Sequence, residues 1–203
     1  MKAQIQIDGN PYQITIQKVL TFDQLDEDAK AKAHENLMGT AHSDWWDNVY
    51  SMIADDLHFV GFDADRKSFQ FNLDRGEGFA FDGNWSLDRR TRESFRSLTN
   101  ADKAQSFAKV LDEIQGRHDA ELIIQVTGRM GFSRPFIEVE SELDGDDELT
   151  DADASLIDRT LQNLCSRYLA MLREESEHLE SVDYVKEVIE TNGYRFDMNG
   201  HLI

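Results

Sequence analysis

The chain has 203 residues, 40% of them hydrophobic, and its 40 acidic and 21 basic residues give a formal net charge of −19. This length allows about 70% of the unfolded chain's surface to be buried, and no Gly-, Ser- or Pro-rich linker divides the sequence, so we predict a single domain over residues 1–203. The charge disfavours direct binding to nucleic acid or to anionic membranes, because both are polyanions.

The N-terminal part predicts a β-hairpin followed by two helices. Residues 3–7 and 12–19 alternate apolar and polar side chains around the turn formers at 8–11. Thr21 and Gln24 have the spacing of a capping box, which predicts a first helix from residue 22 to Gly39. A second helix is expected from Ser43 to a stop at Gly61, with Trp45 and Trp46 in the core.

The middle of the chain predicts two hairpins on either side of a helix. Aromatic side chains that alternate with polar ones indicate strands at 62–73 and 79–81, joined by a glycine-rich turn. An irregular segment at 84–100 precedes a helix at 101–115, and 122–127 and 136–141 are expected to pair around the turn at 128–131.

The C-terminal part predicts the longest helix, at 151–179. Thr150 is the expected N-cap, because its hydroxyl can accept from a free backbone N–H of the first turn, and Leu161 and Leu164 lie on the apolar face. A break near Ser181 separates a last short helix with Val182, Val185 and Ile189 inward. The fold class is therefore α+β, with antiparallel hairpins packed against several amphipathic helices in a single domain.

Three stretches resemble a family of small proteins of bacteriophage and prophage genomes. They are FDQLDEDAKAKA at 22–33, RGEGFAF at 75–81 and NGYRFDMNGHLI at 192–203. The family typically has a Ser-Gln-Gly-Asp-Gly-Ala-Ser-Phe turn, where this chain has Asp74-Arg75 before the first glycine and Phe79-Ala80 after the last. Some members are labelled antitoxin-like, and no catalytic residues are established, so the resemblance implies a phage setting and no active site.

The sequence lacks the familiar catalytic signatures. No phosphate-binding loop, dinucleotide fingerprint, zinc-protease helix, nucleophile elbow or Cys-x-x-Cys occurs. Glu174 and His178 share a helical face and could ligate a metal, but a solvated charged surface is the favoured interpretation. Cys165 is expected as a buried thiol. We therefore expect no cofactor and no metal, and a binding protein rather than an enzyme.

A basic cluster stands out within the acidic chain. It consists of Arg89, Arg90, Arg92 and Arg96. With Trp85 and Phe95 it could hold a phosphate backbone, but the net charge of −19 makes nucleic acid a poor partner, and internal salt bridges explain the cluster best. Otherwise it could join two copies, so a homodimer is possible. The turn at 75–78 could hold an anion through consecutive glycine amides, although a tight hairpin explains the glycines at least as well.

The acidic surface is the candidate site. Residues 135–203 carry 18 acidic and 5 basic residues. The start of the chain lacks the apolar segment of a signal peptide, and no apolar run could span a bilayer, so we expect a cytoplasmic protein. The predicted partner-binding residues are Asp144, Asp146, Asp147, Glu148, Glu177, Glu180, Asp183, Glu187 and Glu190.

The preferred hypothesis is a phage-type inhibitor that binds a basic, nucleic-acid-binding surface of a host protein or nucleoprotein complex. A CRISPR or restriction complex is the expected target, with the carboxylates mimicking nucleic acid. This mimicry requires a helix that continues through Ser181 if Glu180, Asp183, Glu187 and Glu190 are to share a face. The alternatives are acidity for solubility alone, an antitoxin that neutralises a partner toxin, and an enzyme with an unrecognised carboxylate or histidine site.

Overall fold

The computed structural model describes residues 2–7, 10–15, 18–38, 44–85, 101–118, 120–131, 134–144 and 148–203. For residues 2–7, 10–15 and 101–105 it describes the backbone only. Residues 1–45 with 176–203 form one compact unit, called unit 1, and residues 46–175 form the other, unit 2. Helices and antiparallel strands together confirm the α+β class. A single domain over residues 1–203 stays a prediction, which one shared unfolding transition for both units would confirm.

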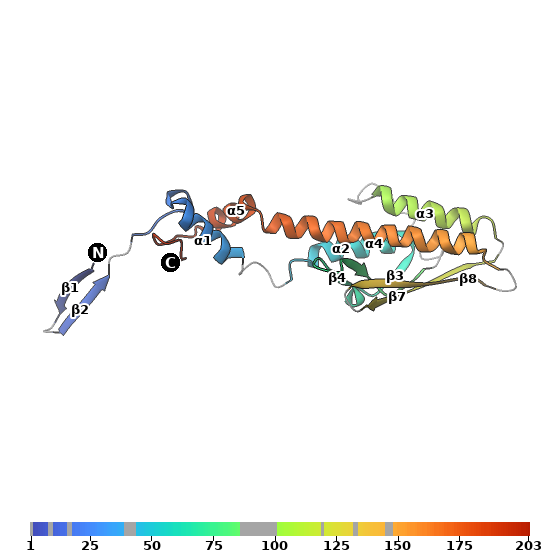
Figure 1. Cartoon of the computed structure of the whole chain (residues 1–203), viewed down its shortest axis with the longest axis horizontal. Helices are drawn as coiled ribbons and strands as arrows, with labels where there is room; N and C mark the ends of the chain where they lie inside the picture. Colours follow the sequence, from blue (N-terminus) through green and yellow to red (C-terminus); the bar gives the residue numbers. More distant parts are fainter. Residues whose placement is uncertain are drawn as a thin grey trace. The chain divides into compact units, whose positions relative to one another are not determined.

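Unit 1 contains the predicted hairpin and a small helical core. The antiparallel strands β1 (Lys2–Ile7) and β2 (Asn10–Thr15) form the hairpin, drawn in blue in Figure 1. The capping box at Thr21 is present, but it caps the short 3-10 helix η1 (Phe22–Gln24), and α1 (Glu27–Met38) starts only after it. Gly39, the predicted stop, lies outside the described residues.

The core of unit 1 is built by α1, α5 (Val182–Asn192) and the tail. Its buried side chains are Leu20, Phe22, Leu25, Ala29, Ala33, Val185, Ile189 and Phe196. Phe196 exchanges backbone hydrogen bonds with Leu20 at 2.9 Å in both directions, which fixes the tail beside the start of this unit. Val182, predicted to point inward, is 61% exposed, because the core side of α5 begins at Val185.

Unit 2 has a four-stranded antiparallel sheet in the order β3-β6-β7-β8. Its strands are β3 (Phe62–Ala64), β6 (Gly83–Trp85), β7 (Leu122–Met130) and β8 (Pro135–Leu143). The helices α2 (Asp47–Val60), α3 (Ala101–Gln115) and α4 (Asp151–Leu179) lie along one side of it in Figure 1. The helix α4 is the longest described helix, as predicted, and its residues up to Glu175 belong to unit 2.

The predicted strand at 62–73 is wrong in its middle. Asp65 Oδ1 accepts a hydrogen bond from the Lys67 amide at 2.9 Å and caps the 3-10 helix η2 (Arg66–Ser68). This turn separates β3 from β4 (Gln70–Asn72), and β4 forms the predicted hairpin with β5 (Gly78–Ala80) as a small two-stranded sheet. The strand β6 was not predicted, and the segment that follows it, at 86–100 with the four arginines, lies outside the described residues.

The core of unit 2 joins the helices to one face of the sheet. The rings of Phe62 and Phe107 stack with centroids 6.0 Å apart, and Phe81 meets Phe62 edge-on at 5.7 Å. Leu161 and Leu164 are buried, as predicted. Trp45 and Trp46 are only partly buried, which corrects their assignment to the core. They precede α2 rather than lying inside it, so neither occupies its buried face.

Candidate functional site

The predicted acidic residues of unit 1 are exposed but do not form one stripe. The side chain of Ser181 accepts a hydrogen bond from the Tyr184 amide at 3.2 Å and starts α5 after a break. Glu177 therefore belongs to α4 and Glu180 to the turn, while α5 carries the other three, Asp183, Glu187 and Glu190. The continuous helix that the mimicry hypothesis required is absent from this described segment.

The predicted acidic residues of unit 2 are only partly described. Asp144 and Glu148 are exposed, whereas Asp146 and Asp147 lie outside the described residues. Asp144 is fixed through its backbone amide, which donates to the Glu121 carbonyl at 2.8 Å. The structure thus places the seven described residues of the nine in two groups, five in unit 1 and two in unit 2.

A second acidic group, which the sequence reasoning missed, lies on β8. Glu138, Glu140 and Glu142 alternate along the strand and are all exposed, while Ile137 and Leu143 are buried on the opposite side. Arg129 of β7 pairs with Glu138 at 2.5 Å. The signal was present in the sequence: three glutamates at every second position of a predicted strand must share its solvent face.

A groove of about 440 Å³ opens beside the start of β8 in unit 2. Its walls are the end of the β4–β5 connection, the first residues of β8 and the middle of α4. Its lining is mixed, with Phe136, Ile137 and Leu169 as apolar members and Arg134, Asp158 and Gln162 as polar ones. The groove can therefore accept a small apolar side chain next to polar backbone or charged groups.

The glycine-rich turn that the phage resemblance singled out forms one wall of this groove. Gly76 has φ +87°, which favours glycine, and a Cβ on Gly78 would lie 2.4 Å from the Pro135 carbonyl oxygen. Glu77 pairs with Arg173 of α4 at 2.6 Å. Turn geometry and close approach to β8 thus explain both glycines structurally.

The titratable groups with the largest described pKa shifts do not form an ionised site. Burial raises the pKa of the Cys165 thiol, which lines the groove, to about 12, so it stays protonated. Burial, and then the neighbouring Asp55 charge, raise the pKa of Asp56 to about 6, against an opposing effect of Arg167. Tyr168 is fully buried, and its pKa is raised by burial and then by Asp56.

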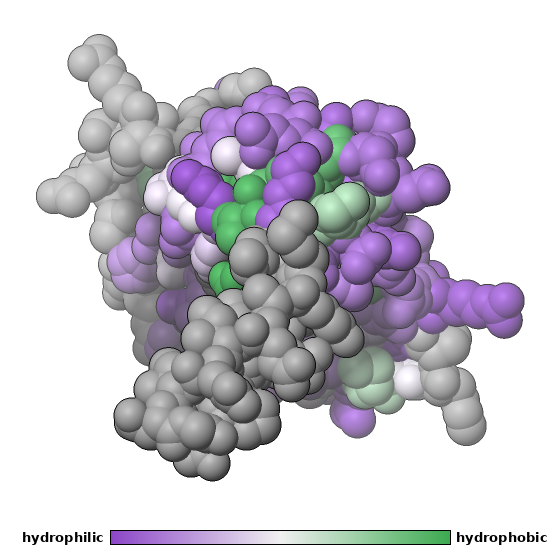
Figure 2. Space-filling model, turned by 90° about the vertical axis from the view of Figure 1, so that its left-hand side faces the viewer, coloured by the Kyte–Doolittle hydropathy of each residue, from purple (hydrophilic) through white to green (hydrophobic). Residues whose placement is uncertain are grey.

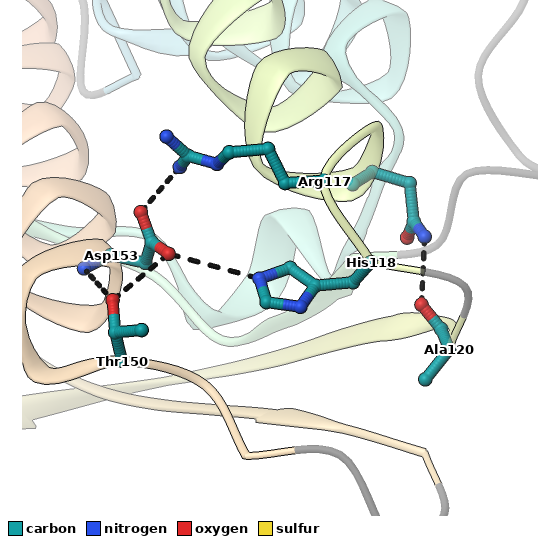
Figure 3. Close-up of polar contacts among 6 residues, drawn as sticks. Arg117, His118, Ala120, Thr150 and Asp153 are labelled. Carbon is teal, nitrogen blue, oxygen red and sulfur yellow. Dashed lines mark hydrogen bonds and ion pairs between the residues drawn. The ribbon is translucent and has the colours of Figure 1, made fainter.

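Figure 3 shows a partly buried ionic cluster where the end of α3 meets the start of α4. The Thr150 hydroxyl accepts from the Asp153 amide at 3.2 Å and donates to Asp153 Oδ2 at 3.0 Å, which confirms the predicted cap. Arg117 pairs with Asp153 Oδ1, and His118 Nε2 lies 3.8 Å from Oδ2. His118 Nε2 is buried and makes no hydrogen bond to a described residue, but Thr150 and Arg117 both hold Asp153, so we assign the cluster to helix positioning.

The Glu174 and His178 pair does not form a metal site. Glu174 pairs with Arg167 at 3.1 Å, and the His178 ring packs on Tyr184 with centroids 5.1 Å apart. Across the described part of the chain, no group of three or more His, Cys, Asp or Glu side chains could hold a metal ion. Within the same residues, no helix is both long and apolar enough to cross a membrane.

The chain matches no family model, no curated protein and no solved structure. The resemblance to the phage family therefore stays a prediction, and function must be argued from the surface itself.

Proposed function

We propose that this protein is a cytoplasmic, phage-type inhibitor that binds a basic, nucleic-acid-binding surface of a host protein or nucleoprotein complex. A CRISPR or restriction complex is the proposed target class. The single observation that supports it best is that, in both units, several exposed carboxylates make no ion pair with another described residue. In unit 1 they include Glu180, Asp183 and Glu187, and in unit 2 Glu140 and Glu142.

The arrangement of charge in unit 1 favours attraction over internal neutralisation. On α5, Lys186 lies 3.3 Å from Asp23 and 3.8 Å from Glu190, and it is the one basic side chain of that helix. Asp183 and Glu187, one turn apart, make no ion pair within the described residues. In Figure 2, most of the coloured surface belongs to hydrophilic residues.

Electrostatic attraction of this kind acts over a short range in physiological salt. The Debye length is about 8 Å at 0.15 M ionic strength, so the carboxylates must approach the partner's cations closely. A nucleic-acid-binding surface supplies closely spaced Lys and Arg side chains, which suits clustered carboxylates. The split at Ser181 limits phosphate mimicry by α5 to Asp183, Glu187 and Glu190.

The experiment is competition for a partner recovered from a host-cell lysate at low salt. Duplex DNA should displace this protein from the partner, and affinity should fall steeply between 50 and 200 mM salt, by about tenfold or more. The charge-reversed variant Glu180→Lys/Asp183→Lys/Glu187→Lys should bind more weakly, with folding checked by circular dichroism. A partner that binds equally well in high salt and with saturating DNA contradicts the proposal. If the recovered partner is a toxin that DNA does not displace, the antitoxin alternative is favoured.

A further inference from the structure

The strand β8 is the last strand of the unit 2 sheet and pairs with β7 alone over nine residues, Pro135–Leu143. Among the described residues, no backbone hydrogen bond joins β8 to any strand other than β7. In an antiparallel strand, the N–H and C=O groups of every second residue point away from the partner. At the start of β8, Gly78 of β5 lies against the Pro135 carbonyl, because a Cβ there would be 2.4 Å from that oxygen. Beyond this contact, the free side of β8 is a row of donors and acceptors that can bind another extended chain.

The helical layer covers this edge incompletely. Across the β7–β8 register, Val126 lies opposite Val139 and Ile124 lies opposite Ser141. Val126 and Ile124 are 2% and 0% exposed, whereas Val139 and Ser141 on the same face are partly exposed. A further strand beside β8 would place its inward side chains next to these two residues and towards the groove between β8 and α4.

The outer face of the edge is negatively charged at regular intervals. Glu138, Glu140 and Glu142 repeat every second residue, which corresponds to about 6.6 Å along a strand. Arg129 neutralises Glu138, but Glu140 and Glu142 make no ion pair within the described residues. Cross-strand neighbours of opposite charge stabilise a sheet, so a basic strand fits this face best.

A second copy of this chain fits the edge poorly. Pairing of two β8 edges would bring the glutamate rows of both copies side by side, and like charges opposite one another destabilise a sheet. The formal net charge of −19 on each copy adds to this repulsion. Charge complementarity therefore selects a basic peptide segment of a different protein.

We propose that an extended basic peptide binds the free edge of β8 as a fifth strand. Its alternate Lys or Arg side chains lie beside Glu138, Glu140 and Glu142. Its intervening small apolar side chains lie beside Val139 and over the groove. The inference rests on the proposed function in one respect, the basic partner, and it adds a binding mode in which backbone hydrogen bonds supply part of the affinity.

The test uses a nine-residue peptide of alternating valine and lysine, with blocked ends and a fluorescent label, titrated at low salt. The variant Glu138→Gln/Glu140→Gln/Glu142→Gln should bind it at least tenfold more weakly than the unmodified protein. The matched variant Asp28→Asn/Glu35→Gln/Glu113→Gln removes the same charge from exposed helical sites outside the predicted partner-binding set and should stay within about twofold. The same peptide N-methylated at every residue keeps its charge but cannot donate, and it should also bind at least tenfold more weakly.

Three results overturn the proposal. If both triple variants lose peptide affinity equally and the N-methylated peptide binds fully, the peptide is held only by general electrostatic attraction to the acidic protein. This result leaves the proposed function intact. Absence of peptide binding at low salt removes the edge site. Self-association of the β8 variant in sedimentation, without peptide binding by the unmodified protein, means that the glutamates only keep the edge unpaired. Failure of DNA to displace the recovered partner is a separate result and contradicts the proposed function instead.

Discussion

The adjacent strands β7 and β8 have the same alternating pattern but different surroundings. Leu122, Ile124 and Val126 of β7 are 0–2% exposed beneath the helices, whereas Val139 and Ser141 of β8 are partly exposed on the same face. The difference arises because, in the described sheet, β7 pairs with a strand on both sides and β8 pairs only with β7. It indicates that the inner strand mainly stabilises unit 2, and that the outer strand is available for binding.

The largest expected effect is the loss of packing at the inner strand. Ile124→Ala should lower the free energy of unfolding by about 2–5 kcal/mol, because the site is fully buried and the cavity cannot collapse completely. Val139→Ala should cost less than about 1 kcal/mol, since its side chain is already partly hydrated. Urea unfolding of both variants measures the difference, and equal costs would show that the two strands are covered alike.

A buried carboxylate should behave differently from the exposed glutamates of β8. The pKa of Asp56 is raised to about 6 in the folded state, so between about pH 4 and 6 the folded protein holds a proton that the unfolded chain has released. The stability that this proton provides is therefore present at low pH and lost as the pH rises through 6. The isosteric variant Asp56→Asn lacks this loss.

As the pH rises from 4 to 8, the free energy of unfolding of Asp56→Asn should accordingly rise by up to about 3 kcal/mol relative to that of the unmodified protein. The matched change Glu140→Gln, on an exposed residue, should leave the free energy of unfolding within about 0.5 kcal/mol at both values. Urea unfolding at pH 4 and pH 8 supplies the comparison. A constant difference between Asp56→Asn and the unmodified protein across this range would place the carboxyl in water.

A smaller effect is expected where β5 approaches the start of β8. In Gly78→Ala, the new methyl group would lie 2.4 Å from the Pro135 carbonyl oxygen, so one of the two segments must move. The cost should be about 1–3 kcal/mol, as for other overpacked sites. The control Gly76→Ala tests backbone strain instead, because its φ is +87°. Unchanged thermal unfolding of Gly78→Ala would mean that β5 does not press on β8.

Local chemistry made much of the fold predictable from the sequence. The stop at Gly61, the cap at Thr150 and the break near Ser181 depend on backbone groups within a few residues, and the structure has them as predicted. The strand at 62–73 failed because its aromatic alternation continues through a turn that Asp65 caps. A side-chain pattern alone does not reveal this interruption.

The candidate site was only half predictable. Alternation places Glu138, Glu140 and Glu142 on one strand face, but edge status depends on the insertion of β6 between β3 and β7, which is a non-local pairing. The predicted stripe on the last helix assumed that helical spacing would continue through Ser181. The Ser181 hydroxyl instead caps a new helix, so the stripe is divided.

Residue-by-residue amide hydrogen exchange, with and without the valine–lysine peptide, tests the free edge of β8 most directly. The proposed fifth strand should slow exchange of alternate β8 amides within 138–142 by at least tenfold, while the amides of Ile124 and Val126 on the inner strand should change little. Slowed exchange confined to α5, or none in β8 at saturating peptide, would contradict the account.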